Sequence, residues 1–391
     1  MSEARPFAIP KQLVWDAYQR VKANRGAAGV DGVSLAAFET DLKNNLYKVW
    51  NRMASGSYHP PPVRLVEIPK ATGGTRPLGI PTVADRVAQT AVTMVLEPLV
   101  EPHFHPDSYA YRPGRSALDA VGTARKRCWR TDWVIDLDIK AFFDSMPRDL
   151  IERAVAHHTD LAWVKLYVGR WLRAPVEHPN GTLEERTKGT PQGGVWPTSS
   201  CTTLVHCGSE AEAQSVLEAI RGRLAECGLE LHPTKTRVVY CKDDDRPGKY
   251  EHIAFDFLGY TFQPRRAKNR WGRYFISFLP AISTKAATAI RQTIRNWRMA
   301  STRNNQRLED LARLANPVVR GWLNYYGRFY RSRCVQVLRH FNEALGKWAQ
   351  RKYTRFRRRE RAAMHWLGRI ARRDPNLFVL WQQGVRPEAG V

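Results

Sequence analysis

The spacing of apolar residues changes near Pro280, and no other feature constrains the fold of this 391-residue chain as strongly. Before Pro280, short apolar runs are bounded by turn-forming residues, which is typical of strands. After it, apolar residues recur every three or four positions, which predicts helices. The helical stripes are Ala286, Ile290, Ile294 and Trp297; Val319, Trp322, Tyr326 and Tyr330; and Leu338, Phe341, Leu345 and Trp348. The sequence therefore predicts an α+β part followed by an all-helical part.

The α+β part divides further by the same patterns. Helices are predicted over residues 11–50, with a turn at AAGVDGVS in the middle, and over residues 84–99. Strands are predicted at 63–70, which runs into a glycine-containing hairpin turn at 71–76, and at 133–143 and 237–241. FDFLGYTF and RYFISFL predict two further strands with a basic turn between them.

The charge of the chain indicates its partner. Lys and Arg number 62 against 37 Asp and Glu, a net charge of +25, and nucleic acid is the default partner of such a surplus. Charge alone leaves ribosomal, membrane-surface and DNA-binding roles open. Residues 351–373 hold ten Lys or Arg and one Glu, with Tyr353, Phe356 and Trp366 between them. This pattern predicts phosphate contacts and stacking on unpaired bases, against the alternative of a solvated basic helix. The RNA-binding candidates are Arg351, Lys352, Arg355, Arg357, Arg358 and Arg359.

Other ligand and partner classes find little support. The six cysteines include no CxxC pair, and the loose group of Cys201, His206 and Cys207 is a poor zinc pattern, so reduced thiols are expected. No apolar run approaches the ~18–20 residues of a membrane span. The first residues, MSEARPFAIPKQ, lack the apolar segment of a signal peptide. We therefore expect a cytoplasmic protein without a membrane partner.

Two carboxylates mark a candidate metal site. The alternation of the strand predicted at 133–143 places Asp136 and Asp138 on one face. Neighbouring buried carboxylates repel unless a cation neutralises them, which favours a metal. The alternative is a capping Asp at the end of a strand.

Two glycine-containing segments are weaker signals. GTPQGG (189–194) allows close backbone approach by a flat or phosphorylated ligand, although alone it is only a loop. Lys70 and Arg76 flank the turn of the predicted hairpin, as expected of a flap over a triphosphate, but surface hairpins often carry such residues.

In combination these motifs are specific. From about residue 10 to about residue 380 the chain resembles the reverse transcriptases of bacterial group II introns, also called intron maturases. The motifs stand in family order: NRGAAGVDGVS, IPKATGGTRPLGIPTVADRVAQ, SYAYRPGRSALDAV, WVIDLDIKAFFDSM, GTPQGGV, ECGLELHPTKTRVVYC, FDFLGYTF and NPVVRGWLNYYGRF. The resemblance implies right-hand fingers and palm over residues 1–280, a helical thumb and maturase domain over 281–378, and a short tail over 379–391. It includes no endonuclease module.

The resemblance also implies roles for single residues. Asp138, with the Ile139 carbonyl beside it, matches the first metal ligand, and Lys235 matches the lysine near the leaving pyrophosphate. These are the expected catalytic and metal-binding positions, with Mg²⁺ as cofactor. Nucleotide-binding roles fall on Lys70, Arg76, Phe143 and Gln192, and primer positioning on a strand containing Phe257, Leu258, Gly259 and Tyr260. The implied partners are structured intron RNA, an RNA/DNA hybrid and deoxynucleoside triphosphates.

One departure from the family pattern concerns the metal site. Family members carry a palm helix and a Tyr-Ala-Asp-Asp turn after GTPQGGV, whereas residues 186–209 of this chain contain no Asp or Glu. LVHC and SEAEAQ resemble the end of the following strand and the start of the next helix. Counting back from them, Cys201 and Thr202 stand where the two carboxylates belong. The resemblance therefore implies an internal deletion near residues 195–203.

The deletion bears directly on the chemistry. Two Mg²⁺ ions ~3.5–4 Å apart need carboxylate ligands, for which a thiol or a hydroxyl is a poor replacement. Asp138 alone is expected to hold them weakly. Other acids have little claim, because Asp243, Asp244 and Asp245 stand in a predicted turn, and Glu184 and Glu185 precede the Gln loop.

Three functional hypotheses follow. The first is a maturase-type protein that binds intron RNA and assists splicing and mobility, with its RNA-directed DNA polymerase activity lost or impaired. The second is an active RNA-directed DNA polymerase that uses Asp138 and an unrecognised acid. The third is a decayed remnant of a mobile-element gene, since a missing palm helix would expose apolar strand surface.

Overall fold

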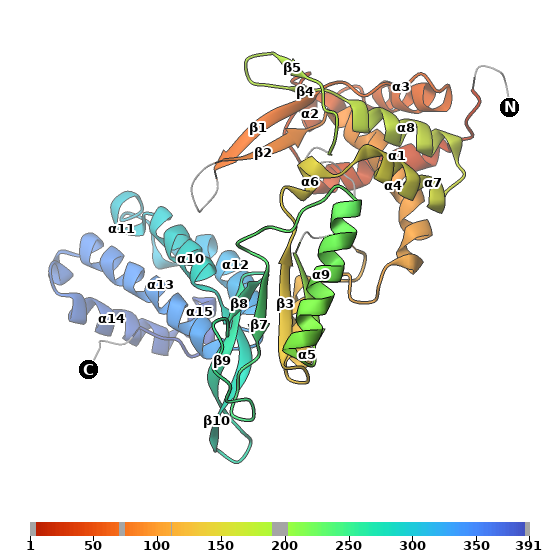
Figure 1. Cartoon of the computed structure of the whole chain (residues 1–391). Helices are drawn as coiled ribbons and strands as arrows, with labels where there is room; N and C mark the ends of the chain where they lie inside the picture. Colours follow the sequence, from red (N-terminus) through yellow and green to blue (C-terminus); the bar gives the residue numbers. More distant parts are fainter. Residues whose placement is uncertain (1–4, 70–74, 111, 190–201, 388–391) are drawn as a thin grey trace. The chain divides into compact units, whose positions relative to one another are not determined.

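The computed structural model describes residues 5–69, 75–110, 112–189 and 202–387. The chain forms two compact units, drawn together in Figure 1, and each is assembled from three segments. Unit 1 comprises residues 1–116, 137–203 and 215–236, and unit 2 comprises 117–136, 204–214 and 237–391. These units do not follow the boundary expected at residue 280, and the division into fingers, palm and thumb stays a prediction.

Unit 1 is built around a helical core. Its helices are α1 (Lys11–Asn24), α2 (Leu35–Glu39), α3 (Leu42–Ala54), α4 (Val83–Val100), α6 (Phe142–Ser145), α7 (Arg148–His158) and α8 (Ala162–Arg173), with a 3-10 turn at Glu101–His103. Apolar faces of α1, α3, α4 and α8 meet in one buried cluster. The Ser34 hydroxyl caps α2 and the Thr82 hydroxyl caps α4. The helices predicted over 11–50 and 84–99 are confirmed, as is the turn between α1 and α2.

A buried carboxylate lies within this core. Asp85, on α4, is 1% exposed. Its Oδ1 accepts hydrogen bonds from Trp171 Nε1 at 2.7 Å and the Tyr58 hydroxyl at 2.8 Å, and its Oδ2 accepts one from Gln89 Nε2 at 2.8 Å. Burial raises the pKa of Asp85 to about 6, although the three donors act in the opposite direction. The carboxylate therefore joins α4, α8 and the segment after α3.

A four-stranded sheet completes unit 1, in the order β2-β1-β4-β5. Its strands are β1 (Val63–Pro69), β2 (Thr75–Ile80), β4 (Val176–Glu177) and β5 (Leu183–Glu184). β1 and β2 pair antiparallel from Arg64↔Ile80 to Pro69↔Thr75, which confirms the predicted hairpin. β1 also pairs in parallel with β4.

Unit 2 contains a small sheet in the order β6-β3-β7. β7 (Arg237–Tyr240) confirms the strand predicted at 237–241, and it pairs antiparallel with β3 (Trp133–Asp138) from Trp133↔Tyr240 to Asp136↔Arg237. β6 (Thr202–Cys207) is followed by α9 (Glu210–Glu226), which confirms that LVHC ends a strand and that SEAEAQ begins a helix. Both β3 and α9 continue from unit 2 into unit 1.

The strand predicted over 133–143 was too long. β3 ends at Asp138, Ala141 adopts a left-handed conformation with φ 47°, and α6 begins at Phe142. A left-handed residue cannot continue a strand, so the apolar pair Phe142-Phe143 lies on a helical turn instead.

The second sheet of unit 2 has the order β10-β9-β8, with β8 (Phe255–Phe257), β9 (Tyr260–Lys268) and β10 (Tyr274–Ile282). The motif FDFLGYTF was predicted as one strand, but Leu258 (φ 49°) and Gly259 (φ 78°) form the two-residue turn of the β8–β9 hairpin. Positive φ at both central residues is typical of a type I′ turn. Phe257 and Tyr260 are therefore paired across a turn.

These two sheets share a core with α5 (Ala117–Cys128). Cys128 and Cys241 are buried there, and the neighbouring thiol of Cys241 together with burial raises the pKa of Cys128. The five cysteines among the described residues carry free thiols, as expected; Cys201 lies outside them.

The remainder of unit 2 is helical. Its elements are α10 (Thr284–Asn296), α11 (Met299–Thr302), α12 (Leu308–Tyr326), α13 (Arg331–Lys352), the 3-10 turn Thr354–Phe356, α14 (Glu360–Arg373) and α15 (Val379–Gln382). The predicted stripes face a separate core, and all four residues of the α13 stripe are buried. Tyr330 differs, because it precedes α13 and its hydroxyl donates to the Arg266 carbonyl at 2.8 Å. In the described part of the chain, none of the helices has the length and apolar character needed to cross a membrane.

Candidate functional site

The carboxyl end of β3 brings two predicted catalytic residues together. Lys235 Nζ lies 2.9 Å from Asp138 Oδ2, and both residues belong to unit 1. The Asp138 side chain is 17% exposed and that of Lys235 is 62% exposed. The pair is therefore accessible from solvent on the lysine side.

Backbone contacts hold the segment before Lys235 beside Asp138. The His232 amide donates to the Asp138 carbonyl at 2.7 Å, and the Lys140 amide donates to the Glu230 carbonyl at 2.9 Å. Ile139 forms a β-bridge with Leu231. The Asp138 amide also donates to the Thr236 hydroxyl oxygen at 3.4 Å. The two segments thus lie side by side, which fixes Lys235 next to the carboxylate.

The described residues at this place do not fit a two-metal site. Among them no three His, Cys, Asp or Glu residues come together in a way that could hold an ion. Asp138 and the neighbouring Ile139 carbonyl offer one carboxylate and one backbone oxygen, whereas Mg²⁺ pairs are held by several carboxylates. Cys201 and Thr202 align with the two carboxylates of the family pattern. Cys201 and the side chain of Thr202 lie outside the described residues.

The other acids considered from the sequence have different surroundings. Asp136 lies opposite Arg237 in the β3–β7 register. The Asp243 carboxylate is ion-paired with Arg246, and Asp244 Oδ2 accepts a hydrogen bond from the Ile276 amide at 2.8 Å. These contacts hold the turn after β7 in place, in agreement with the turn predicted there.

The surroundings of Gly189 explain why the GTPQGG motif begins with a glycine. A Cβ built at Gly189, where φ is 78°, would lie 2.5 Å from the Phe143 carbonyl oxygen. The Gly189 amide donates to the Met146 carbonyl at 2.8 Å. The close backbone approach expected of this motif is therefore made at Gly189, but to α6 of the same unit. Gln192 lies outside the described residues.

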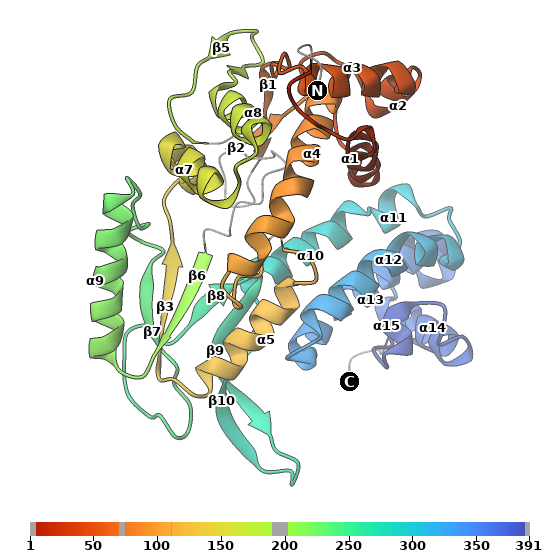
Figure 2. The same cartoon turned by 90° about the vertical axis from the view of Figure 1, so that its right-hand side faces the viewer.

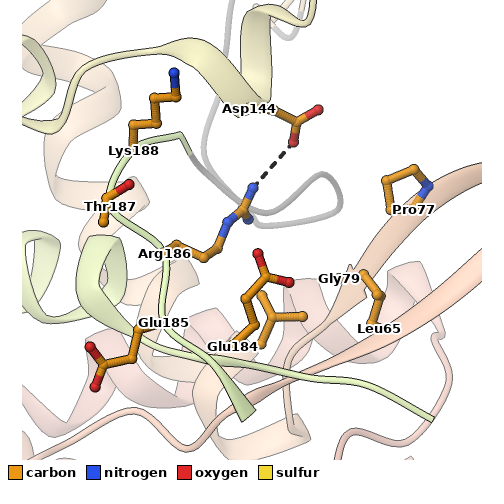
Figure 3. A pocket seen from close by; sticks show the side chains of 10 residues that line it. Leu65, Pro77, Gly79, Asp144, Glu184, Glu185, Arg186, Thr187 and Lys188 are labelled. Carbon is orange, nitrogen blue, oxygen red and sulfur yellow. Dashed lines mark hydrogen bonds and ion pairs between the residues drawn. The ribbon is translucent and has the colours of Figure 1, made fainter. Parts of the chain in front are cut away.

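A cavity of about 360 Å³ lies between α6, the sheet of unit 1 and the segment before Gly189 (Figure 3). At one side Arg186 extends toward Asp144, and the two are ion-paired at 3.2 Å. The lining residues are Leu65, Pro77, Gly79, Asp144, Val176, Glu184, Glu185, Arg186, Thr187 and Lys188. Sequence reasoning did not single out Arg186 and Asp144, although the charged run before GTPQGG was a signal. Lys70 and the side chain of Arg76 lie outside the described residues.

The predicted primer-positioning residues form the β8–β9 turn of unit 2. Tyr260 is fully buried, and Leu258 is 37% exposed. The Tyr325 hydroxyl donates to the Leu258 carbonyl at 2.8 Å, which links the turn to α12. The sequence predicted these four residues as part of a strand, and their position at a turn corrects that prediction.

The basic segment of unit 2 displays most of its predicted RNA-binding cations. Arg351, Arg355, Arg357, Arg358 and Arg359 are exposed. Lys352 is partly buried and donates to the backbone carbonyls of Asn305 and Gln306.

The aromatic residues of this segment correct a prediction. Phe356 is 7% exposed, and Tyr353 and Trp366 pack around it in edge-to-face and tilted contacts. Phe356 is therefore a core residue and is not available for base stacking. Arg355 lies 4.7 Å from the centre of its ring, so this cation covers the cluster on the solvent side.

Two separate segments of the chain match known protein families. Residues 68–206 match the reverse transcriptase (RNA-dependent DNA polymerase) family, and residues 287–366 match the group II intron, maturase-specific domain. The chain belongs to the family of group II intron-encoded reverse transcriptases and maturases.

Several known proteins are similar to parts of the chain. Protein YkfC of Escherichia coli is 37% identical over 174 residues, covering 43% of this chain and 45% of that protein. Group II intron-encoded protein LtrA of Lactococcus lactis is 30% identical over 191 residues, 48% of this chain and 31% of LtrA. The putative COX1/OXI3 intron 1 protein of Saccharomyces cerevisiae is 28% identical over 190 residues, 48% of this chain and 22% of that protein. The chain thus spans less than half the length of these relatives.

The two family matches cover different candidate sites. The reverse transcriptase match includes Asp138, Phe143 and the Arg186–Asp144 pair, while Lys235 lies beyond its end. The maturase match includes the exposed cations from Arg351 to Arg359.

Proposed function

We propose that this protein is a maturase-type protein that binds structured intron RNA and assists splicing and mobility, with its RNA-directed DNA polymerase activity lost or impaired. The match of residues 287–366 to the maturase-specific domain carries the proposal. The exposed arginines of that region and the net charge of +25 support it, because cations that neutralise phosphates release counterions and supply affinity.

Filter binding of intron RNA at several salt concentrations tests the RNA-binding part. We expect the logarithm of the association constant to fall linearly with the logarithm of salt concentration. Arg357→Ala with Arg358→Ala should reduce that slope, whereas Arg223→Ala, which removes a cation paired with Glu226 on α9, should leave it unchanged. An affinity that does not depend on salt would contradict the proposal.

The impaired polymerase activity rests on the charge balance at Asp138. Asp138 is ion-paired with Lys235, which neutralises the single carboxylate without a metal. No described group of three ligands surrounds it. The proposal therefore holds that Mg²⁺ binds weakly here and that transition-state stabilisation by metal is largely missing.

An active RNA-directed DNA polymerase is the second candidate, and the proximity of Asp138 and Lys235 favours it, because both were expected at a polymerase site. It would take Mg²⁺, deoxynucleoside triphosphates and an RNA/DNA hybrid. Lys70, Arg76, Phe143 and Gln192 as nucleotide-binding residues, and residues 257–260 as a primer contact, stay predictions, as does a cytoplasmic location.

Primer extension on an RNA template with Mg²⁺ separates the two candidates. The proposal expects no template-dependent extension by the wild-type protein while RNA binding is retained. Extension that Asp138→Ala abolishes would establish the polymerase. A decayed remnant predicts instead a non-cooperative thermal transition, so a sharp transition would count against that third hypothesis.

A further inference from the structure

The outer half of the β9–β10 hairpin leaves the core of unit 2. The two strands pair without interruption from Ile282↔Tyr260 to Tyr274↔Lys268. Phe262 and Phe278 are fully buried near one end, but residues 274–276 and 270–273 are exposed. Figure 2 shows this end of the hairpin extending beyond the other elements of its unit. Core packing therefore does not explain why the segment from Arg266 to Ile276 carries large apolar side chains.

Four large apolar side chains are exposed on this segment. Trp271 is 71% exposed, Tyr274 59%, Phe275 40% and Ile276 37%. Single exposed apolar residues are ordinary, but a group of them in one short segment marks an interaction surface. The same segment carries four cations and no acid: Arg266, Lys268, Arg270 and Arg273. None of these four cations takes part in the ion pairs found among the described residues.

The cations and rings are interleaved. The Arg266 guanidinium lies 3.8 Å from the centre of the Tyr274 ring, and that of Arg270 lies 4.1 Å from the Trp271 ring. Lys268 is directly opposite Tyr274, and Arg266 is directly opposite Ile276, so these four side chains share one face of the hairpin. A membrane-binding element would separate its apolar and charged faces, whereas stacked bases joined by phosphates need both together.

The tip is held in one conformation. Asn269 Oδ1 accepts hydrogen bonds from the Trp271 and Arg273 amides, both at 3.0 Å. The Asn269 amide donates to the Arg273 carbonyl at 3.0 Å, and Gly272 supplies the positive φ of 84° that the turn needs. The indole of Trp271 is therefore displayed by a closed loop, which lowers the entropy lost when it binds a ligand.

We propose that residues 266–276 form a second RNA-binding surface, which takes unpaired nucleotides of single-stranded RNA. Trp271 stacks on a base, Tyr274 extends the stacking surface, and Arg266, Arg270 and Arg273 contact the flanking phosphates. This inference rests on the proposed RNA-binding function and adds to it a contact distinct from the arginines of residues 351–359. It also assigns base stacking to the hairpin, where the rings are exposed, and not to Phe356, which is buried.

Fluorescence anisotropy with a labelled single-stranded RNA, and with a duplex of the same sequence, tests the proposal on the full chain. Trp271→Ala should weaken single-strand binding about tenfold, since stacking of one base is lost, and should affect the duplex much less. Trp271→Phe should retain most of the affinity because it keeps a ring. Leu183→Ala is the matched control, since Leu183 is 59% exposed on β5 of unit 1. Because Trp271 is exposed, none of these changes removes core packing.

The outcomes separate this inference from the proposed function. Wild-type protein that binds neither RNA would refute both. Wild-type binding that Trp271→Ala and the double variant Arg270→Ala/Arg273→Ala leave unchanged would refute the hairpin surface alone. Equal losses on single strand and duplex would refute base stacking. A variant that loses binding to phosphatidylserine vesicles while its RNA affinity is unchanged would assign the surface to a membrane and overturn the proposal.

Discussion

Replacing Asp85 with Ala tests how the core of unit 1 is held together. The change removes the acceptor for three donors, Tyr58, Gln89 and Trp171, which are 4–5% exposed. A buried donor without a partner costs about 1–3 kcal/mol, so the free energy of unfolding should fall by about 3 kcal/mol or more. Domains are stable by only ~5–15 kcal/mol, so a loss of this size should be easily measured.

Replacing Asp85 with Asn separates hydrogen bonding from charge. An Asn keeps one oxygen for Tyr58 and Trp171, and the Gln89 amide can turn to accept from its nitrogen. In the folded protein the pKa of Asp85 is raised from 3.8 to about 6. The folded state therefore binds the proton more tightly, so the contribution of Asp85 to the free energy of unfolding is greatest below pH ~4 and is lost as the pH rises through 6. A shift of this size corresponds to about 3 kcal/mol, which Asp85→Asn should abolish.

Urea unfolding followed by hydrogen exchange of peptides from α4 and α8 measures both effects, and it does not require the whole chain to unfold in one step. Measurement at pH 5 keeps the carboxyl largely protonated, so Asp85→Ala gains nothing there by removing a buried charge. Asp160→Ala, at a surface carboxylate paired with Lys165, is the control. The reasoning is refuted if Asp85→Ala unfolds within about 1 kcal/mol of wild type at pH 5, or if Asn is as damaging as Ala.

Three other changes follow from the fold. Leu258→Asn should raise thermal stability, because the left-handed conformation costs Leu about 1–2 kcal/mol and suits Asn; a lower melting temperature would contradict this. Trp348→Ala should destabilise the helical core by about 3–5 kcal/mol in urea unfolding, since the indole is fully buried and its nitrogen donates to the Arg303 carbonyl. Asn269→Ala should increase hydrogen exchange at the hairpin tip and weaken single-strand RNA binding, and unchanged exchange would show that the tip does not depend on this side chain.

The sequence predicted most of the elements because their patterns are local. Helical stripes of three or four residues, such as Leu338 to Trp348, face the core as expected, and β1 pairs with β2 as the predicted hairpin requires. The errors lie where one residue adopts a left-handed conformation. Ala141 lies between the end of β3 and α6, and Leu258 forms with Gly259 the turn within FDFLGYTF. Neither Ala nor Leu is a residue whose identity signals such a turn.

The order of the motifs predicted which residues form the candidate site. The structure adds contacts between distant residues, which sequence motifs do not predict. Lys235 reaches Asp138 because residues 230–236 lie beside the end of β3, a contact between positions almost a hundred residues apart. Base stacking was wrongly predicted for Phe356, because the alternation of aromatic and basic residues does not reveal which side of a helix is buried. Asp85 was missed since a lone acid in a helix is usually exposed.

The assembly of each unit from three chain segments has a consequence for synthesis on the ribosome. The β3 residues Trp133–Asp136 leave the ribosome about a hundred residues before their β7 partners. At a translation rate of about 5–20 residues per second, this apolar strand edge waits roughly 5–20 s for a partner. During that interval Trp133, Val134 and Ile135, which the finished protein buries, are open to other nascent chains. The yield of folded protein should therefore depend on chaperones that bind the growing chain before residue 240 emerges.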